Sequence, residues 1–454
     1  MDAKKSYVVE TWGCQMNVYD SQRFAAQLEA LGYVPATSAD GAGDAGDADL
    51  VLLNTCSVRE KAAHKMFSRL GRLRQLKKAK PELLVGVGGC VAQQEQERIL
   101  KREPAVDFVV GTRAVGRLPE LVASAAAGNR AVDVAMEPRY DDIRPVAPGK
   151  SRRAYITAVE GCDKACSFCI VPTTRGKEVN RSPETLVAEA AAAIAAGAVE
   201  VELLGQNVNA YRHGDVDFAG LLRMVGRLEG LHRLRFTTSH PRELTDPVIA
   251  AMAATDAVCE HLHLPVQSGS DAVLKRMYRG YDRARYLDRV ERLRRRIPDV
   301  ALSTDIIVGF PGETEAEFDD TMRLLDEARF DQVFAFVYSP RPFTAAAAFP
   351  DGVAEERKQA RLQRLFRRQD ELAREKSQAL LGRTFEVLLD DQPTPLRMSG
   401  DDATEPARGQ LLSGRTRCNR IVHVPPPNDP GPVLVQARIV RALPHSLVGE
   451  LVAA

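Results

Sequence analysis

The stretch VEGCDKACSFCIVPTTRG, residues 159–176, places Cys162, Cys166 and Cys169 within eight residues of one another. Cysteines that hold an iron–sulfur cluster each bind a different iron, and spacers of three and two residues bring three sulfurs to neighbouring corners of a cubane 4Fe-4S cluster. No fourth cysteine lies nearby in the sequence, so one iron would keep an open position. The spacing therefore indicates a cluster that can bind a small molecule.

The alternatives are a structural zinc site and three unrelated buried cysteines. Zinc usually completes its tetrahedron with a fourth Cys or His at short spacing, and none stands within reach in the sequence. The surroundings also favour a cluster on a strand–loop–helix unit. Residues 154–159 predict a strand, and Ser182 followed by Pro183 predicts the start of a helix.

Composition limits the remaining choices. A chain of 454 residues suggests roughly three domains at about 150 residues each. The 62 basic and 61 acidic residues nearly cancel, so nucleic-acid binding would depend on local patches. No apolar run reaches the length of a membrane span, and the first residues lack the apolar core of a signal peptide. We expect a cytoplasmic protein, with no part in a membrane, whose cysteines bind metal or are buried as thiols.

Residues 1–130 alternate between predicted strands and helices, which favours a parallel α/β sheet of the doubly wound type. The strands are predicted at residues 7–12, 50–54, 83–87 and 108–110, with the first helix at residues 21–31. Cys14, Cys56 and Cys90 each follow the end of a different strand. Loops after parallel strands meet at one edge of the sheet. A single such thiol is more often a small buried apolar residue, but three in equivalent loops predict a second 4Fe-4S cluster.

Residues 148–381 predict a partial (β/α)6 barrel of the TIM type, followed by a connecting helix. Six strands are expected at residues 154–159, 199–204, 234–237, 261–264, 301–308 and 333–338. Catalytic groups of such barrels gather on the loops after the strands, where the 159–176 stretch also falls. Gln206 and Asn207 follow the second strand and are candidates to hydrogen-bond a nucleoside cofactor. The GFPGET loop after the fifth strand predicts a helix that starts at Glu313, and the alternative for all these loops is simple turns.

Residues 382–454 predict a small β-barrel, because short alternating strands are separated by Gly and Pro. Arg415, Arg417 and Arg420 cluster beside a predicted strand. A small barrel with a basic edge suits RNA. The alternative is an accessory domain that only stabilises the protein.

In this order of domains, the chain resembles the radical S-adenosylmethionine methylthiotransferase family over nearly its whole length, with a TRAM-type barrel at the end. Four segments carry the likeness: NTCSVREKAAHK, YITAVEGCDKACSFCIVPTTRGKEVNRSPE, HLPVQSGSDAVLKRMYRGYDR and GRTRCNR. They are most similar to the branch that acts on isopentenylated adenosine in tRNA. The sister branches, which act on threonylcarbamoyl-adenosine in tRNA or on an aspartate of a ribosomal protein, are alternatives, as is a non-catalytic RNA-binding protein with structural metal sites.

The resemblance implies two 4Fe-4S clusters with different tasks. The cluster on Cys162, Cys166 and Cys169 would bind S-adenosylmethionine and reduce it to a radical that removes hydrogen from carbon 2 of N(6)-dimethylallyladenosine. The cluster on the other three cysteines would supply the sulfur for the 2-methylthio group. An electron relay is the alternative for that cluster, and the missing fourth cysteine argues against it.

The resemblance also implies the partners of such an enzyme. These are the anticodon arm of tRNA, a reductant such as flavodoxin or ferredoxin, and a sulfur source, and we expect the protein to act as a monomer. Cys259 and Cys418 are not expected to be ligands. The family usually reads RPGT where this chain has Arg341-Pro342-Phe343-Thr344. The sequence leaves open how this loop accommodates the bulky Phe343.

Overall fold

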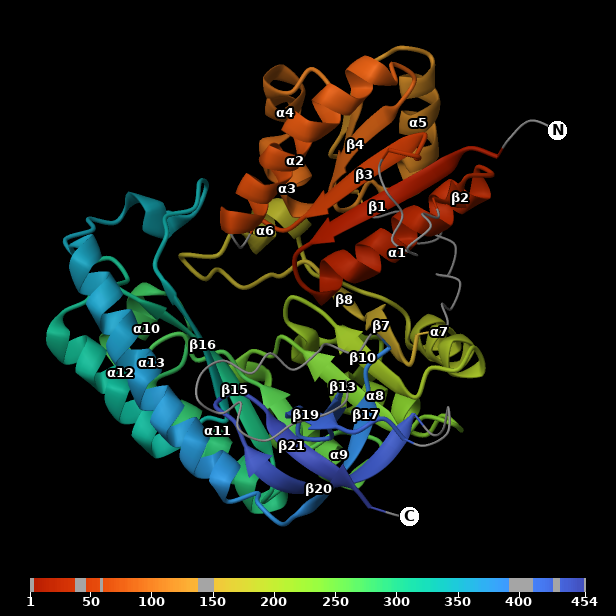
Figure 1. The fold of residues 1–454 in the computed structure, drawn as a ribbon. Helices are drawn as coiled ribbons and strands as arrows, with labels where there is room; N and C mark the ends of the chain where they lie inside the picture. The colour runs from red at the N-terminus through yellow and green to blue at the C-terminus, as the bar shows by residue number, and fades with distance from the viewer. Residues whose placement is uncertain are drawn as a thin grey trace, which may run out of the picture.

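Figure 1 shows a computed structural model of the chain, which describes residues 4–36, 46–57, 60–137, 151–391, 411–427 and 433–452. An N-terminal α/β domain is followed by a partial barrel and then by a small closed β-barrel. The N-terminal domain lies above one end of the partial barrel, and the closed barrel lies at the other end (Figure 1). This three-part architecture confirms the predicted fold class.

The N-terminal domain is a six-stranded parallel sheet with the order β2-β1-β3-β4-β5-β6. Its strands are β1 Ser6–Trp12, β2 Val34–Pro35, β3 Leu50–Thr55, β4 Leu84–Gly88, β5 Phe108–Val110 and β6 Ala131–Asp133. Its helices are α1 Gln15–Ala30, α2 Glu60–Ala79, α3 Gly89–Glu95, α4 Glu97–Arg102 and α5 Leu118–Ala126, with a 3-10 turn at Val115–Arg117. Strand β3 is buried along its whole length. Leu50 and Leu52 pack into one apolar cluster, and Val51 and Leu53 pack into another, so helices cover both faces.

Two boundaries of this domain differ from the prediction. Helix α1 begins at Gln15 rather than at residue 21, because Cys14 and Asn17 form a capping box that starts the helix directly after β1. Strand β6 lies beyond the predicted boundary at residue 130 and pairs with β5. It is a half-buried edge strand of three residues, too short to give a period-2 pattern. The predicted surface loop and much of the predicted linker, residues 37–45 and 138–150, lie outside the described residues.

The partial barrel has two sets of parallel strands, β7-β10-β13 and β14-β15-β16. They are β7 Arg153–Thr157, β10 Glu200–Leu204, β13 Arg233–Thr237, β14 His261–His263, β15 Ala301–Val308 and β16 Gln332–Val337, each within two residues of its predicted bounds. A backbone bridge between Leu234 and Val258 joins the two sets. Within the described part of the chain no pairing joins β7 to β16, so the barrel stays open on that side.

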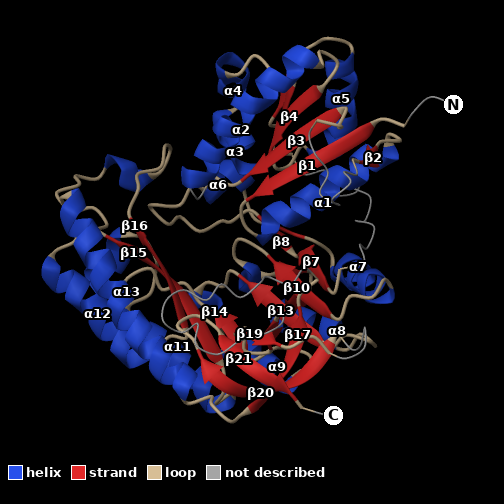
Figure 2. Cartoon of the chain, in the orientation of Figure 1, coloured by secondary structure: helices blue, strands red, loops and turns tan. Residues whose placement is uncertain are grey.

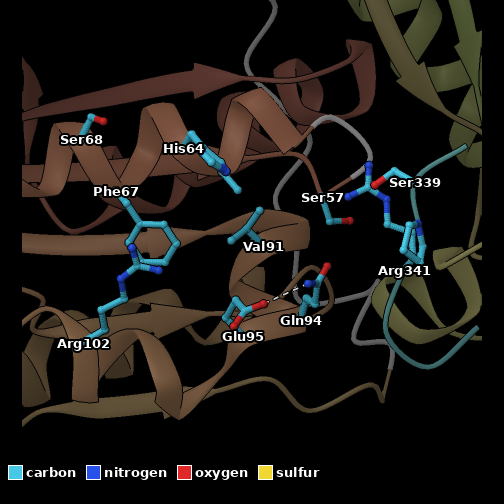
Figure 3. Close-up of a pocket in the computed structure, with 12 residues that line it drawn as sticks. Ser57, His64, Phe67, Ser68, Val91, Gln94, Glu95, Arg102, Ser339 and Arg341 are labelled. Atoms are coloured by element: carbon cyan, nitrogen blue, oxygen red, sulfur yellow. Dashed lines mark hydrogen bonds between the residues drawn. The ribbon is translucent and has the colours of Figure 1, made fainter. Parts of the chain in front are cut away.

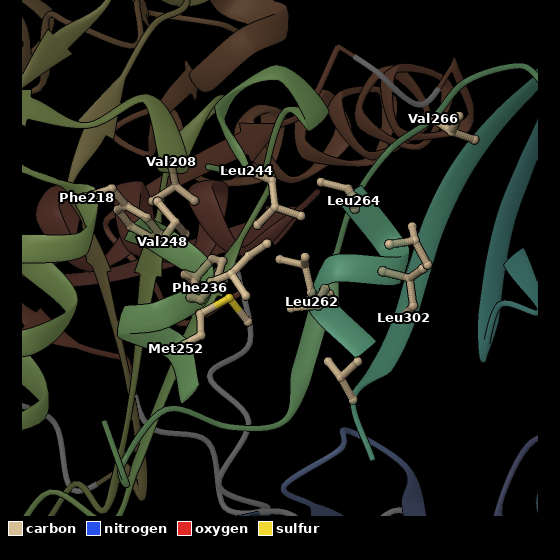
Figure 4. Packing of buried hydrophobic residues seen from close by; sticks show 14 of the residues in the cluster. Val208, Phe218, Phe236, Leu244, Val248, Met252, Leu262, Leu264, Val266 and Leu302 are labelled. Carbon is tan, nitrogen blue, oxygen red and sulfur yellow. The ribbon is translucent and has the colours of Figure 1, made fainter. Parts of the chain in front are cut away.

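Helices cover the outside of this barrel (Figure 2). They are α7 Pro183–Ala195, α8 Phe218–Gly226, α9 Asp246–Ala254, α10 Asp271–Arg276, α11 Arg283–Arg296, α12 Glu315–Ala328 and α13 Glu355–Gln378. As predicted, Ser182 caps α7, and its hydroxyl accepts a hydrogen bond from the Thr185 N–H at 3.2 Å. Helix α12 begins at Glu315 instead of Glu313, because Thr314 is its N-cap. Between helices and strands lies the largest apolar core, part of which Figure 4 shows around Phe218 and Phe236.

The remaining barrel segments are short. They are β8 Val159–Glu160, α6 Val171–Arg175, β9 Val179–Asn180, β11 Arg212–His213, β12 Val216–Asp217 and the 3-10 turns Val208–Ala210, Pro241–Glu243 and Ala345–Ala348. Strands β8 and β9 pair antiparallel to each other, and the cysteine loop lies between them in the sequence. None of the helices in the described ranges is long and apolar enough to cross a membrane.

The C-terminal strands close into a five-stranded barrel in the order β17-β18-β19-β21-β20. They are β17 Thr384–Leu389, β18 Leu412–Thr416, β19 Ile421–Val424, β20 Leu434–Ala442 and β21 Leu447–Leu451. Inward-facing Val387, Val422, Ala437 and Ile439 form its core. The prediction of a small β-barrel is confirmed, although the sequence pattern had not indicated β18 and β21.

Candidate metal centres

The three N-terminal cysteines lie on neighbouring loops at one edge of the sheet. Cys14 follows β1, Cys56 follows β3, and Cys90 is the second residue of α3, which follows β4. These three strands are adjacent in the sheet, so their loops leave it side by side. A Cβ atom added to Gly13 would lie 2.9 Å from the Cys56 Cβ atom, which shows how closely the first two loops approach. The structure therefore brings the three predicted ligands to one place.

A buried amide network fixes the base of this site. The Asn17 side chain donates to Asn54 Oδ1 at 3.1 Å, and Asn54 Nδ2 donates to Ser21 Oγ at 2.9 Å. Gly89 has a φ of +84°, and a Cβ atom there would lie 2.2 Å from Asn54 Oδ1. Only glycine fits this combination of conformation and space. The network thus fixes the backbone between β4 and α3, and with it the position of Cys90.

The acidity of these thiols differs. A hydrogen bond from the Cys56 side chain and the charge of Arg175 lower the pKa of Cys14 to about 6, despite the opposing effect of desolvation. Burial raises the pKa of the Cys90 thiol, which the same Arg175 counteracts in part. Because thiolates rather than thiols bind metals, Cys14 is ready to bind at neutral pH. Cys90 would release a proton on binding.

The second set of cysteines lies on the loop between β8 and α6. The Cys162 N–H donates to Gly176 O at 3.1 Å, and the Cys169 N–H donates to Cys166 O at 3.1 Å, which folds the loop back on itself. Burial raises the pKa of Cys169 to about 12. Buried Arg279 donates from Nη1 to Cys166 Sγ at 3.3 Å and from Nη2 to Pro265 O at 2.8 Å. Arg279 thus provides positive charge beside a sulfur that would be negative in a cluster.

The side chains present fit iron–sulfur clusters better than other metal groups. Each set offers three thiols, and soft thiolate ligands favour iron–sulfur clusters and zinc over hard cations such as Mg²⁺. Within the described ranges, no three His, Cys, Asp or Glu side chains are arranged as ligands of a single metal ion. Three thiols in each set match the number of protein ligands that a cubane cluster with one open iron requires.

The two predicted cofactor-binding residues have different environments. Gln206 Oε1 accepts a hydrogen bond from the Gly161 N–H at 2.5 Å, so this side chain supports the residue directly before Cys162. Asn207 is 2% exposed, and neither polar atom of its side chain has a hydrogen-bond partner. A buried amide without partners is costly. Asn207 is therefore a candidate to bind a ligand, whereas Gln206 positions the cysteine loop.

Arg175 connects the two cysteine triplets, and the sequence alone did not indicate it. It is the last residue of α6, six positions after Cys169, and is 2% exposed. Its Nη2 atom lies 2.6 Å from Asp20 Oδ2 on α1, and its Nη1 atom lies 3.4 Å from Glu160 Oε1. The same guanidinium acts on the Cys14 and Cys90 thiols. The only sequence signal was an arginine immediately after the cysteine loop, in TTRG.

Of the three arginines expected at an RNA-binding edge, Arg417 and Arg420 contact the partial barrel instead. Arg417 donates to Glu260 Oε1 at 2.8 Å and to Val258 O at 2.8 Å, and Arg420 donates to Asp331 Oδ1 at 2.5 Å. Arg415 contacts Asn419 within the small barrel. From the other side, the fully buried Arg233 donates to the Glu386 carboxylate at 2.7 Å and to the Arg415 carbonyl at 2.7 Å. These contacts dock the small barrel, and the RNA role of the three side chains stays a prediction.

Known proteins resemble the chain in sequence and in fold. The Uncharacterized protein family UPF0004 matches residues 6–111, and the Radical SAM superfamily matches residues 156–325. A tRNA-2-methylthio-N(6)-dimethylallyladenosine synthase of Desulfosudis oleivorans is 44% identical over 98% of this chain and 96% of the relative. A relative of the same name from Geobacter metallireducens is 44% identical over 99% of both chains.

Among solved structures, the radical S-adenosylmethionine methyltransferase TsrM of Kitasatospora setae, with cobalamin and a [4Fe-4S] cluster bound, has a TM-score of 0.59. It shares 16% sequence identity and covers 76% of this chain and 77% of its own. At this identity the likeness concerns the fold alone. The sequence relatives, by contrast, match the chain from end to end.

Proposed function

Because the chain belongs to the tRNA-2-methylthio-N(6)-dimethylallyladenosine synthase family, we propose that it converts N(6)-dimethylallyladenosine beside the tRNA anticodon into its 2-methylthio derivative. The observation that supports this most strongly is the presence of two separate cysteine triplets, connected by Arg175. A reaction that both activates a base and adds sulfur to it needs two such sites. A reaction that only activated the base would not require the N-terminal triplet.

Each triplet would hold one 4Fe-4S cluster with an open iron. When bound at Cys162, Cys166 and Cys169, the cluster together with S-adenosylmethionine supplies the radical chemistry needed at an aromatic C–H bond, which no acid or base side chain can break. Gln206 accepts a hydrogen bond from the backbone next to Cys162 and so holds the cysteine loop in place. Arg279 places a positive charge beside the Cys166 sulfur. Asn207 offers a buried amide donor and acceptor for S-adenosylmethionine.

The N-terminal triplet would present sulfur to the activated base. Contacts between the N-terminal domain and the barrel fix the position of one site relative to the other. Besides Arg175, Thr112 Oγ1 donates to Thr174 O at 2.7 Å, and Arg113 donates to the carbonyls of Glu160 and Lys177. These contacts hold the segment around α6 against the N-terminal domain. The protein thus contributes position and shielding rather than acid–base catalysis.

The proposed function requires three further partners. The substrate is the anticodon arm of a tRNA that already carries the isopentenyl group. A one-electron donor of the flavodoxin or ferredoxin type and a source of sulfide are also needed. We further propose that the enzyme works in the cytoplasm as a monomer.

Mass spectrometry of tRNA nucleosides provides the test. A strain without the gene should accumulate N(6)-dimethylallyladenosine and lack its 2-methylthio form, and the wild-type gene should restore it. A gene with Cys162→Ala should not. Loss of the 2-methylthio group from threonylcarbamoyl-adenosine instead would assign the chain to the sister activity and overturn the proposal.

A further inference from the structure

The loop after β16 contains a tight turn with an unexpected residue at its most demanding position. Thr344 donates from its N–H, at 3.3 Å, and from its hydroxyl, at 2.7 Å, to the Arg341 carbonyl. Pro342 follows Arg341, and Phe343 has a φ of +67°. A proline and then a residue with positive φ are the pattern of a type II turn, which favours Gly at the second central position. Phenylalanine is an unfavourable residue for this backbone.

Burial does not compensate for this strain. The Phe343 side chain is 70% exposed, the highest value among the large apolar side chains of the described residues. Neither the turn nor the core of the protein therefore accounts for an aromatic ring here. Strained residues that the surrounding structure maintains often serve a binding site.

The turn lies beside the cysteine loop of the barrel. Ala346, two residues after the turn, donates its N–H to the carbonyl of Ser167 at 2.8 Å, and Ser167 lies between Cys166 and Cys169. This contact ties the loop after β16 to the candidate site for S-adenosylmethionine. Phe343 thus lies three residues before a residue that contacts the cysteine loop.

The residues before the turn line a pocket of about 400 Å³ that reaches the N-terminal domain (Figure 3). Ser339 and Arg341 form one side, and Ser57 and Val91 lie across from them. Ser57 follows Cys56 and Val91 follows Cys90, so the pocket adjoins the loops of the second cysteine site. Ser57 is 5% exposed, and its hydroxyl has no hydrogen-bond partner.

The charge of the pocket suits an anion. Arg341 lies at one end and Arg102 at the other, where its guanidinium stacks 3.7 Å from the centre of the Phe67 ring (Figure 3). Among the described residues that line the pocket, the carboxylate is that of Glu95, to which Gln94 donates at 2.9 Å. A guanidinium group and a hydroxyl group are suitable ligands for a phosphate.

We propose that the turn of residues 341–344 and this pocket bind the unpaired strand of the tRNA anticodon loop. Phe343 stacks on a nucleobase that neighbours the target adenosine, and Arg341 with Ser57 contacts the backbone phosphate. This inference rests on the proposed function and names the surface by which the substrate is recognised. Base stacking on aromatic side chains tolerates many sequences, so Phe343 would not by itself require one particular base.

Binding of a fluorescent anticodon stem–loop RNA tests the proposal. Asn tolerates positive φ, so Phe343→Asn should keep or raise the melting temperature of the parent, yet weaken RNA binding about 5- to 150-fold. Phe343→Tyr, which keeps an aromatic ring, should bind the RNA as tightly as the parent. Phe366→Asn is the matched control, because Phe366 on α13 is also partly exposed, at 38%. Arg341→Gln should lower the slope of log affinity against log salt by about 0.7–1.

Unchanged RNA affinity in Phe343→Asn and in Arg341→Gln would overturn the inference, and so would an equal loss in the Phe366 control. These outcomes are distinct from a failure of the proposed function. If the proposed function were wrong, the parent enzyme would form no methylthiolated product from isopentenylated RNA. Failure of the inference alone would leave product formation intact.

Discussion

Arg175 Nη2 lies 2.6 Å from Asp20 Oδ2, and both residues are at least 98% buried. Asp20 belongs to α1, the helix that Cys14 caps, whereas Arg175 ends the helix that follows Cys169. The ion pair therefore joins the two elements that carry the first ligand of one site and the last ligand of the other.

Arg175→Gln should destabilise the protein by about 3–5 kcal/mol, because it removes the guanidinium that pairs with the buried carboxylates of Asp20 and Glu160. Arg175→Lys should also cost stability, since an ammonium group cannot bridge two carboxylates as a guanidinium does. Urea unfolding measures both. In a double-mutant cycle, Asp20→Asn should recover part of the loss from Arg175→Gln. Strictly additive effects would show that the pair contributes no coupling.

Asn207→Ala should separate ligand binding from stability. The buried amide has no partner in the protein, so its removal should leave the melting temperature unchanged or slightly higher without S-adenosylmethionine. Affinity for S-adenosylmethionine should fall about tenfold, the value of one lost hydrogen bond of about 1.4 kcal/mol. Gln206→Ala is the contrasting variant. It should release the Gly161 N–H and weaken iron retention at Cys162, Cys166 and Cys169. A lower melting temperature in Asn207→Ala with full affinity would assign that residue to the core.

The sequence predicted the elements that carry chemistry better than it predicted how the domains meet. The barrel strand at residues 301–308 was predicted at its observed bounds, because a long run of apolar and β-branched residues is a local signal. The three N-terminal cysteines could be placed at one edge from topology alone. Each conclusion depended only on residues near one another in the chain or on a general rule for parallel sheets.

Contacts between distant segments were not predictable in this way. An arginine cluster in the sequence has the same appearance whether it faces RNA or a neighbouring domain. The partners of Arg417 and Arg420 are Glu260 and Asp331, which lie 157 and 89 residues earlier. The same reason hid Arg175, whose two carboxylate partners belong to different domains. A charged side chain acquires its role from a partner that only the fold supplies.

Replacement of single cysteines should show that the two metal sites are separate. Cys162→Ala should abolish cleavage of S-adenosylmethionine and keep the iron of the N-terminal site. Cys56→Ala should lose the iron of the N-terminal site and keep that of the barrel site, so that S-adenosylmethionine is cleaved but no methylthiolated product forms. Iron per chain, 5'-deoxyadenosine and product are measured for both.

Cys259→Ala is the control for these variants. Cys259 is buried, and the charges that act most strongly on its thiol are those of Arg235 and Glu200 rather than other cysteines. Its replacement should cost some stability but leave the iron content at the parent value. Full product from Cys56→Ala would disprove the sulfur-donor role of the N-terminal site, and iron loss in Cys259→Ala would add a ligand to the set.

Arg417 allows the docking role and the RNA role of the small barrel to be distinguished. Deletion of residues 382–454 is a poor test, because it would also uncover Arg233, which is fully buried against Glu386. In Arg417→Gln, the loss of the charged hydrogen bonds to Glu260 should reduce stability by about 1.5–3 kcal/mol.

If docking is the role of Arg417, tRNA affinity and its salt dependence should not change in the folded variant. Arg438→Gln is the control, because Arg438 pairs with Glu450 on the exposed surface of the same barrel, where a salt bridge contributes little. The RNA role predicts the opposite pattern. Unfolding would then be that of the parent, whereas the slope of log affinity against log salt would fall by about one for the lost phosphate contact.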